Sequence, residues 1–522
     1  MEPPAQPRDP RDPREPRRDS RGQPGPQGGR EGRDGRGGRD FRRGGGGGDF
    51  RGGRGPQASR QPMPLAQPGP RAPQSPAAVR PAPVSAAVAQ AGVPHGATEL
   101  GWLPDVVWAG EKWENGLAFF ADAQGRITRF SREPADLAQA RRLAGQAALP
   151  GLVNVHAHAL QRVLRGRLDA AASARASEAL AGGDIFDTAR MVFLELLLGG
   201  VTVTGEFHTL LRQPDGTPWP EPNFAAREIL RAAHDVGLRL ALFPVARTRG
   251  DAGRLRETAA TAEQFVRETE LLRAAVERDY PADEAWLGLG VAAVDAVTPD
   301  ELKALVTYAR TQRFRLQVPL PADTAATFGA GRTALAWLAE QGAVDKRFTA
   351  VVSGGLGEED LKVLAAARAA TAVCPGSLPA GTDLAAIARL AAHGAGLALG
   401  TGGNRRCDLL GEARHLHEAR PETAPAAWWQ AATVTGARSL GATGGALEVG
   451  RPADFFTVNL FDPALAGGAL ATLPALLLAN LERRAIRDVW IGGRQRINGG
   501  RHVNQGPIVG RFVDLQKRLW GG

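Results

Sequence analysis

The sequence predicts an α/β protein whose central part is a (β/α)₈ barrel of the TIM type. Between residues 151 and 442, short apolar runs alternate with amphipathic stretches. Apolar runs bounded by turn residues indicate strands, whereas apolar residues spaced three or four apart indicate helices. Strands and helices that alternate eight times over about 290 residues are typical of this barrel.

The predicted barrel strands share a content of aliphatic residues and flanking turn residues. They are Leu152–Val155, Val201–Thr204, Leu238–Val245, Leu287–Val291, Phe314–Val318, Thr349–Val352, Ala370–Val373 and Leu397–Leu399. Helices are predicted between them, at Ala225–Val236, Thr261–Arg278, Pro299–Arg310 and Leu361–Ala370. Active residues of such barrels lie at the carboxyl ends of the strands, where His158 and His208 are found.

Short strands on both sides of this region predict a second, smaller β-domain. Before the barrel they are Asp105–Trp108, Gly116–Phe120 and Gly125–Phe130. Similar stretches return at Ala446–Leu460 and Ile486–Gly493. We therefore predict a small β-domain from residues 99–150 and 443–522, a barrel at 151–442, and a tail and linker at 1–98.

The tail is predicted to be disordered, because Pro, Gly, Arg and Asp cannot bury enough apolar surface to offset the entropy of ordering. Residues 1–98 hold 17 Arg and 9 acidic residues, so they carry +8 of the net charge of +9. Three Arg-Gly-Gly triplets, beginning at Arg36, Arg43 and Arg51, resemble the boxes of RNA-binding tails. Binding of RNA or another polyanion is one interpretation, and a solubilising extension is the other.

Composition excludes several classes of protein. Two cysteines, Cys374 and Cys407, cannot form a disulfide framework and suit a reducing compartment. No apolar signal segment and no run of about 20 apolar residues is present, so we expect a cytoplasmic protein without a membrane span. The body outside the tail is almost neutral, as is usual for proteins that bind small molecules.

The stretch Leu149–Arg162 contains the most informative motif. An apolar run follows the Pro150-Gly151 turn and ends in His156-Ala157-His158. Residues i and i+2 of a strand point to the same face, so the two imidazoles can aim at one point, as ligands of one divalent metal do. The alternative is a pair of hydrogen-bonded histidines at a strand end.

These stretches resemble the amidohydrolase superfamily, and among its members the deiminases that hydrolyse an imine C–N bond. The matching stretches are Leu149–Arg162, Gly200–His208, Pro214–Pro218, Ala296–Pro299, Gly436–Gly441, Leu447–Asp454 and Asp488–Arg494. Their order and spacing cover about residues 100–505. The resemblance implies a metal-dependent barrel joined to a small β-domain from both termini.

The resemblance also implies a site that this chain only half supplies. It implies one zinc held by His156 and His158, a strand-5 His and a strand-8 Asp, with a strand-5 Glu and a strand-6 His moving protons. No histidine lies between His234 and His393. The strand-5 pattern corresponds to Pro319–Asp323, the strand-6 His to Val352 and the strand-8 Asp to Gly402. We therefore expect zinc or another divalent metal as the cofactor, but we do not expect this chain to have the complete set of ligands.

Other residues could take the missing places. Asp323 could act as the general base, its alternative being a solvated loop carboxylate, and Asp408 could fold back toward the metal. Cys374 is a candidate soft ligand or a buried thiol. His415 and His417 lie on a predicted helix about 200° apart, so they do not form a ligand pair.

Substrate-side residues are retained in part. By the resemblance, Gln161, Arg190 and His208 occupy positions that contact a small-molecule substrate, and an Arg can bind a carboxylate in bidentate fashion. Other interpretations are a surface helix arginine for Arg190 and a backbone-bonded histidine for His208.

The sequence supports three functional hypotheses. The preferred one is a degenerate amidohydrolase that has lost ordinary deiminase turnover. The second is an active hydrolase with an unusual metal site built from His156, His158, His208 and Glu206 or Asp323. The third is an RNA- or polyanion-associated protein that acts through its tail. The oligomeric state, a homodimer included, is left open.

Overall fold

The computed structural model describes most of the body of the chain. The described residues are 99–110, 112–167, 172, 175–176, 179–250, 256–259, 261–321, 331–392 and 396–521. The predicted tail and linker, residues 1–98, lie outside them. None of the helices in the described ranges combines the length and apolar character that a membrane crossing requires.

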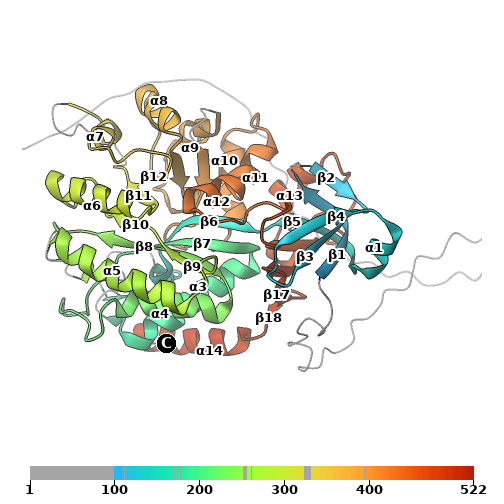
Figure 1. The fold of residues 1–522 in the computed structure, drawn as a ribbon, viewed down its shortest axis with the longest axis horizontal. Coiled ribbons are helices and arrows are strands. Elements are labelled where there is room, and N and C mark those ends of the chain that lie inside the picture. The colour runs from blue at the N-terminus through green and yellow to red at the C-terminus, as the bar shows by residue number, and fades with distance from the viewer. Residues whose placement is uncertain are drawn as a thin grey trace, which may run out of the picture. The chain divides into compact units, whose positions relative to one another are not determined.

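A barrel of parallel strands forms the centre of the fold, as predicted (Figure 1). In the order of their pairing, its strands are β6 (Leu152–Ala157), β7 (Val201–His208), β8 (Arg239–Ala246), β10 (Leu289–Val291), β11 (Leu316–Pro319), β12 (Phe348–Val352), β13 (Ala370–Val373) and β14 (Gly396–Leu399). A short strand, β9 (Ala285–Leu287), pairs with β8. Gly288 separates β9 from β10 and donates its N–H to the Leu242 carbonyl, so the single strand predicted there is divided in two.

The first and last barrel strands meet just past β14. Ala157 and Gly402 form an isolated parallel bridge. The Gly402 N–H donates to the His156 carbonyl at 2.9 Å, and the His158 N–H donates to the Gly402 carbonyl at 2.8 Å. The closure of the barrel therefore runs directly through the His-x-His motif.

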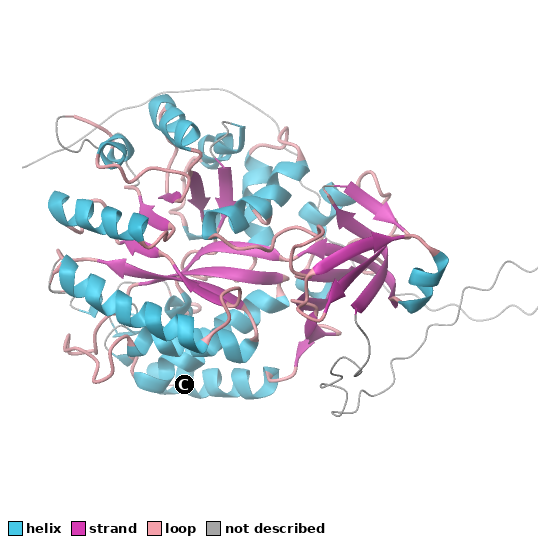
Figure 2. Cartoon of the chain, viewed as in Figure 1, coloured by secondary structure: helices cyan, strands magenta, loops and turns pink. Residues whose placement is uncertain are grey.

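Helices surround the barrel and follow its strands (Figure 2). The α-helices of this region are α3 (Gly182–Leu198), α4 (Phe224–Val236), α5 (Ala262–Asp279), α6 (Pro299–Thr311), α7 (Ala334–Glu340), α8 (Glu358–Ala367), α9 (Leu384–Ala388), α10 (Leu409–Ala419), α11 (Pro425–Ala431) and α12 (Val434–Leu440). Short 3₁₀ turns are η2 (Ala159–Leu164), η4 (Pro375–Ser377) and η5 (Arg389–Ala392). All four helices predicted between strands are present, with ends within about three residues of those expected.

Local sequence signals explain where these helices begin and end. Thr298 and Glu301 form a capping box at the start of α6, and Pro299 occupies its first turn. Helix α4 ends at Gly237, which has φ +80° and so adopts the left-handed conformation that favours glycine. The buried face of α4 carries Ile229 and Val236, which pack into the layer between helices and barrel.

Small and branched side chains and two phenylalanines fill the barrel interior. This cluster consists of Val153, Val155, Val203, Phe207, Ala241, Phe243, Val245, Val351, Ala372, Ala398, Ala437 and Leu440. Such layers make the barrel a packed core rather than a pore. Side chains at the open end of the barrel lie next to this packed cluster.

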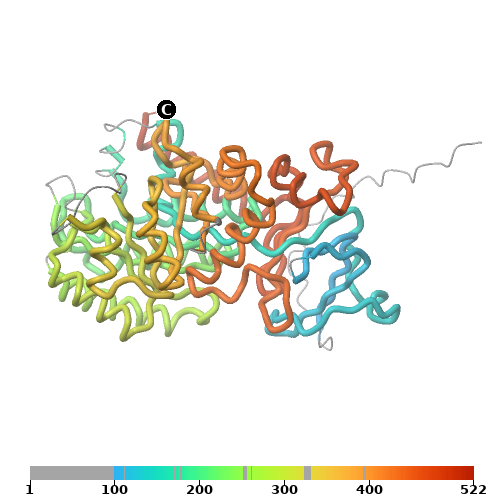
Figure 3. The backbone as a smooth tube through the Cα atoms, turned by 90° about the horizontal axis from the view of Figure 1, so that it is seen from above, coloured from blue at the N-terminus to red at the C-terminus, as the bar shows by residue number. Residues whose placement is uncertain are grey.

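Strands from both ends of the body form a second sheet. Its path runs β18 (Arg501–His502), β17 (Arg494–Asn498), β16 (Ile486–Ile491), β15 (Phe455–Asn459), β5 (Arg141–Pro150), β1 (Glu99–Ala109), β3 (Ala118–Asp122) and β4 (Ile127–Ser131), with β2 (Lys112–Asn115) beside β1. Figure 3 shows the early strands in blue beside late segments in orange-red. This confirms the predicted small β-domain built from both ends of the body. Strands β2, β5, β17 and β18 were not among those predicted.

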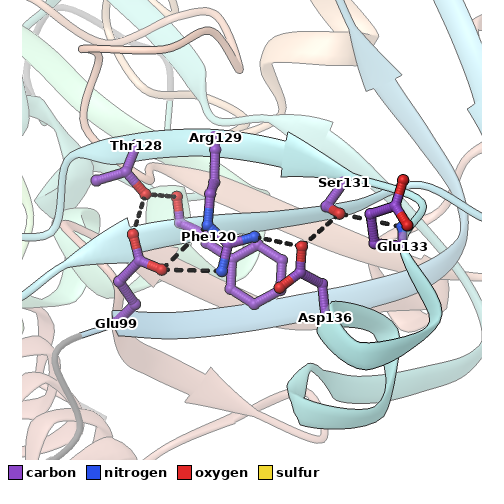
Figure 4. A network of polar contacts seen from close by, with 7 residues as sticks. All are labelled: Glu99, Phe120, Thr128, Arg129, Ser131, Glu133 and Asp136. Carbon is purple, nitrogen blue, oxygen red and sulfur yellow. Dashed lines mark hydrogen bonds and ion pairs between the residues drawn. The ribbon is translucent and has the colours of Figure 1, made fainter.

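The helices that belong to this end of the chain are α1 (Pro134–Gln139), α13 (Leu473–Asn480) and α14 (Gln505–Trp520), with the 3₁₀ turn η6 (Arg483–Ala485). An arginine network joins α1 to the sheet (Figure 4). Arg129 bridges Glu99 at 3.0 Å and Asp136 at 2.7 Å, and its guanidinium lies 3.9 Å from the centre of the Phe120 ring. The network thereby ties β1, β3, β4 and α1 together.

The Pro150-Gly151 turn connects the sheet to the barrel. A Cβ on Gly151 would lie 2.2 Å from the Thr202 hydroxyl, so only glycine fits this close approach. The Gly151 N–H donates to the Asp454 carbonyl, and the Asp454 carboxylate forms a buried ion pair with Arg239 at 2.8 Å. These contacts fix the position of Gly151, where the strand that leads to His156 and His158 begins.

Candidate active site

His156 and His158 converge at the open end of the barrel. Their Nε2 atoms lie 3.2 Å apart and their ring centres 4.9 Å apart. Phe207 of β7 packs on both rings, with ring centres at 4.8 and 5.6 Å. The spacing that predicted two imidazoles aimed at one point is therefore realised in the structure.

Gln317 of β11 fixes the proton on His156. The Gln317 Nε2 donates to the Val155 carbonyl at 2.9 Å, which leaves Oε1 as an acceptor. This oxygen lies 3.0 Å from His156 Nδ1, so Nδ1 carries the proton and Nε2 keeps its lone pair. The lone pair of His156 therefore faces the His158 ring.

The neutral His158 ring has one N–H and faces two hydrogen-bond acceptors. Its Nε2 faces the lone pair of His156, and the Phe207 carbonyl also hydrogen-bonds its ring. Burial lowers the pKa of His156 to about 4 and, with help from the neighbouring His156, that of His158 to about 3. Both rings are neutral at pH 7, so one of the two acceptors goes without a proton. Histidines whose second nitrogen is held by an amide or carbonyl are typical of metal sites.

Glu206 and His208 extend this region along β7. The Glu206 Oε1 accepts the Ala159 N–H at 2.7 Å, at the start of η2. Its Oε2 is buried with no hydrogen-bond partner among the described residues, and burial raises the pKa of Glu206 to about 8. His208 is also buried, which lowers its pKa to about 4, and its ring contacts the backbone of Leu210.

The opposite strands supply no ligand for a metal. The carboxyl ends of β11 and β12 carry Pro319 and Val352, neither of which has a side-chain donor atom. Gly402, just past β14, has φ +52°, and a Cβ there would lie 2.6 Å from the Ser377 Oγ and 3.0 Å from the Cys374 Cβ. The backbone at Gly402 therefore leaves no room for a side chain. Asp323 lies outside the described residues.

A zinc ion fits the two histidines but not the rest of the site. With Zn–N bonds of about 2.0–2.1 Å, two tetrahedral nitrogen ligands stand about 3.3–3.4 Å apart, close to the separation seen here. A tightly held zinc needs three or four protein ligands. Over the described ranges, no group of three His, Cys, Asp or Glu residues could hold a metal. The described residues therefore do not make a complete zinc site.

A cavity of about 1130 Å³ opens beside the histidine pair. Gln161 lines it from η2, together with Ser377 of η4 and Glu412 of α10. Burial raises the pKa of Glu412 to about 7, although its Oε2 accepts the Gly376 N–H at 2.5 Å. His156, His158 and His208 do not line the cavity.

Arg190 lies away from this cavity. It sits on α3 and pairs with Asp235 of α4 at 2.8 Å, with its guanidinium 4.9 Å from the centre of the Phe186 ring. The structure thus brings Gln161 to the cavity and places Arg190 between two outer helices. A substrate contact through Arg190 stays a prediction from the resemblance.

The other candidate residues have local roles in the fold and do not join the histidine pair. Asp408 caps α10, where its carboxylate accepts the Gly411 N–H at 3.0 Å. His415 and His417 lie on α10, as the helix prediction required. Cys374 is a buried free thiol whose pKa is raised by burial.

Sequence reasoning missed Gln317 and Glu412. Gln317 is an amide within the apolar strand Leu316–Val318, and such a residue inside a barrel strand is a signal that could have been used. Glu412 carries no comparable signal, because acidic residues are common on helices. Its burial against the turn at Gly376 depends on the tertiary fold.

Comparison with known proteins defines the class. The model of the amidohydrolase family matches residues 147–496, which is more than half of the chain. The chain therefore belongs to the amidohydrolase family.

Among curated proteins, formimidoylglutamate deiminase of Pseudomonas aeruginosa is 27% identical over 445 residues, which cover 78% of this chain and 97% of that protein. The resemblance to deiminases found in the motifs is thus confirmed over nearly the whole length of that relative.

Solved structures show the same fold. An amidohydrolase from Brucella melitensis superposes with a TM-score of 0.70 at 21% identity, covering 80% of this chain and 99% of that one. An adenosine deaminase from Xanthomonas campestris with bound zinc gives a TM-score of 0.68 at 20% identity, covering 81% and 99%. At this level of identity the likeness establishes the barrel fold.

Proposed function

We propose that this protein is an amidohydrolase-family member that has lost zinc-dependent C–N hydrolysis and keeps its barrel as a binding site for a small molecule. The observation that carries this proposal is the half-built site. His156 and His158 converge as metal ligands do, whereas Val352 and Gly402 stand where the resemblance places a proton-transfer histidine and the strand-8 Asp. The stretch 319–323, where the resemblance places the strand-5 His, contains no histidine.

The remaining residues are poor replacements for the lost chemistry. A hydrolase must activate water, and a bound metal does so by lowering the pKa of that water from 15.7 to about 7. A general base works best when its pKa lies near the operating pH. The histidines, with pKa values of about 4 and 3, are too weakly basic. The pKa of Glu206, about 8, suits a general base, but without a metal there is no water of lowered pKa for it to deprotonate.

The binding half of the proposal rests on the cavity and on the relatives. A cavity of about 1130 Å³ remains open beside the site and is lined by both apolar and charged residues. Gln161 lines it. Formimidoylglutamate deiminase and 5'-deoxyadenosine deaminase, two relatives by sequence, are named for small-molecule substrates.

Metal content is the test. The full-length protein is incubated with zinc, dialysed, and measured by elemental mass spectrometry beside the variants His156→Ala and His234→Ala. His234 is a matched control because it lies on α4, outside the histidine pair and outside the cavity. Hydrolysis of formimidoylglutamate is followed with the same samples.

We expect well below one zinc per chain in all three proteins and no turnover above background. One zinc per chain that is lost only in His156→Ala, together with turnover lost in the same variant, would overturn the proposal. That outcome would support the second hypothesis, a working hydrolase in which His208 and a carboxylate, Glu206 or Asp323, complete an unusual site. The tail-based RNA hypothesis concerns residues outside the described part and stays a prediction.

A further inference from the structure

The loop that follows β14, residues 400–408, is held rigidly by its backbone. The buried Arg162 donates through Nη1 to the carbonyls of Asn404 and Arg405, both at 2.8 Å. Arg483 donates to the Cys407 carbonyl at 2.9 Å. The Asn404 side chain accepts the Thr401 hydroxyl at 2.7 Å, and Asn404 itself adopts φ +51°. The loop is therefore a fixed platform rather than a random connection.

Two adjacent arginines project from this platform. Arg405 and Arg406 are exposed, and their guanidinium groups form no hydrogen bond or ion pair within the described ranges of the chain. Arg162 differs, because it is buried and paired with Glu195 at 2.5 Å. Arg165 is intermediate in pairing and exposure, because it lies 3.3 Å from Glu195 while its side chain is 46% exposed. Among the described residues no ion pair neutralises either charge, although Arg406 lies close enough to Glu412 for its charge to lower the pKa of that carboxyl.

The arginines lie where two concavities meet. Arg165, Arg405 and Arg406 line both the large cavity and a smaller one of about 320 Å³. The residues with formal charge around the smaller concavity are five arginines against Glu195 and Asp408. Because Glu195 is already paired with Arg162, the smaller concavity keeps a net positive charge.

We propose that Arg405 and Arg406, with Arg165 beside them, bind an anionic group of the ligand that enters the large cavity. The group is a carboxylate or a phosphate, because both offer oxygens that match the planar fork of a guanidinium. The rest of the ligand is apolar in part, since Leu160, Val163 and Leu378 also line the large cavity. This assignment rests on the proposed binding role of the barrel and gives its ligand a chemical class.

Geometry explains why these two arginines suit the task. Their side chains start from a backbone that Arg162 and Arg483 already hold, so little conformational freedom of the loop is lost on binding. Ion pairs in a concave site are also screened less by salt than pairs on an open surface.

Calorimetric titration of the full-length protein at low ionic strength tests the assignment. The probes are hexanoate, its neutral analogue hexanamide, and inorganic phosphate. The variants are the double substitution Arg405→Gln/Arg406→Gln and the control Arg487→Gln, an exposed arginine on β16 outside both concavities. Circular dichroism spectra confirm that the variants are folded.

We expect hexanoate to bind the wild type and hexanamide to bind at least about tenfold more weakly, because a charge-assisted hydrogen bond is roughly twice as strong as a neutral one. The double variant should lose at least about tenfold in hexanoate affinity, and Arg487→Gln should match the wild type. Phosphate that binds more tightly than hexanoate assigns the site to a phosphate group instead of a carboxylate.

Binding of neither anion, or equal affinity in wild type and double variant, would overturn the assignment. The outcome is independent of metal content. A protein that holds zinc and also binds hexanoate through Arg405 and Arg406 refutes only the loss of hydrolysis, whereas a zinc-free protein that binds no anion refutes only the anion site.

Discussion

The two sides of the barrel mouth differ in the metal-binding side chains that their described strand ends carry. On the β6–β7 side, His156 and His158 converge, and Glu206 stays buried at the end of its strand. On the β11–β14 side, the corresponding strand ends carry Pro319, Val352 and Gly402. On the β6–β7 side two imidazoles are oriented as metal ligands are, while the described strand ends of the β11–β14 side carry no such side chains and pack closely at Gly402. The convergence of the two histidines thus does not depend on metal-binding side chains at those strand ends.

The largest expected effect comes from Gly402→Asp, which restores a carboxylate to the β11–β14 side. At φ +52°, with a Cβ only 2.6 Å from the Ser377 Oγ, the new side chain should strain the loop and bury an unpaired charge. We expect the free energy of unfolding to fall by about 3–5 kcal/mol, measured by urea denaturation.

Gly403→Asp is the matched control for this substitution. A Cβ at Gly403 meets only the end of the flexible Gln161 side chain, at 2.6 Å. We expect a loss within about 1 kcal/mol. Equal stability of Gly402→Asp and the wild type would show that the β11–β14 side can still accept a ligand, which would break the comparison.

The second effect is a pH dependence that originates at Glu412. Its pKa is about 7 in the folded protein and near 4.5 when exposed, so between these pH values the folded state binds the extra proton. Rising pH therefore favours unfolding across this window. From pH 5 to pH 8, the wild type should lose about 2–3 kcal/mol relative to Glu412→Gln, whose side chain does not ionise. Parallel stability curves for the two proteins would contradict the assignment.

A smaller effect is expected for Gln317→Leu, which removes the contact across the barrel. The substitution leaves the Val155 carbonyl and the His156 Nδ1–H without their partner in the core. We expect a loss of about 1–3 kcal/mol in the free energy of unfolding. Stability equal to that of the wild type would mean that Gln317 does not fix the orientation of His156.

The smallest effect is a gain, at Thr349 on β12. Its register partner on β11 is Gln317, yet its own buried hydroxyl has no hydrogen-bond partner among the described residues. Thr349→Val replaces this hydroxyl by a methyl group of similar shape, so stability should rise by about 0.5–1 kcal/mol in the same denaturation experiment. A loss above about 1 kcal/mol would reveal a polar contact on the β11–β14 side.

The sequence by itself determined the barrel strands and the histidine content of the candidate site. Alternation with periods of two and 3.6 residues is a local property, so the eight barrel strands could be placed without knowledge of their neighbours. His156 and His158 are two residues apart, so their convergence is also local. The lack of histidine between His234 and His393 is a fact of composition that no folding can change.

Tertiary structure decided which groups face one another. Gln317 reaches His156 over 161 positions of sequence, because closure of the barrel brings the two strands' side chains together. Arg190 matches a substrate-contacting position in sequence, yet the packing of α3 on α4 pairs it with Asp235. Likewise, Arg405 and Arg406 resemble any surface arginines until Arg162 and Arg483 fix their loop between two concavities. Local periodicity sets the elements, whereas strand register and helix packing set the partners of each charge.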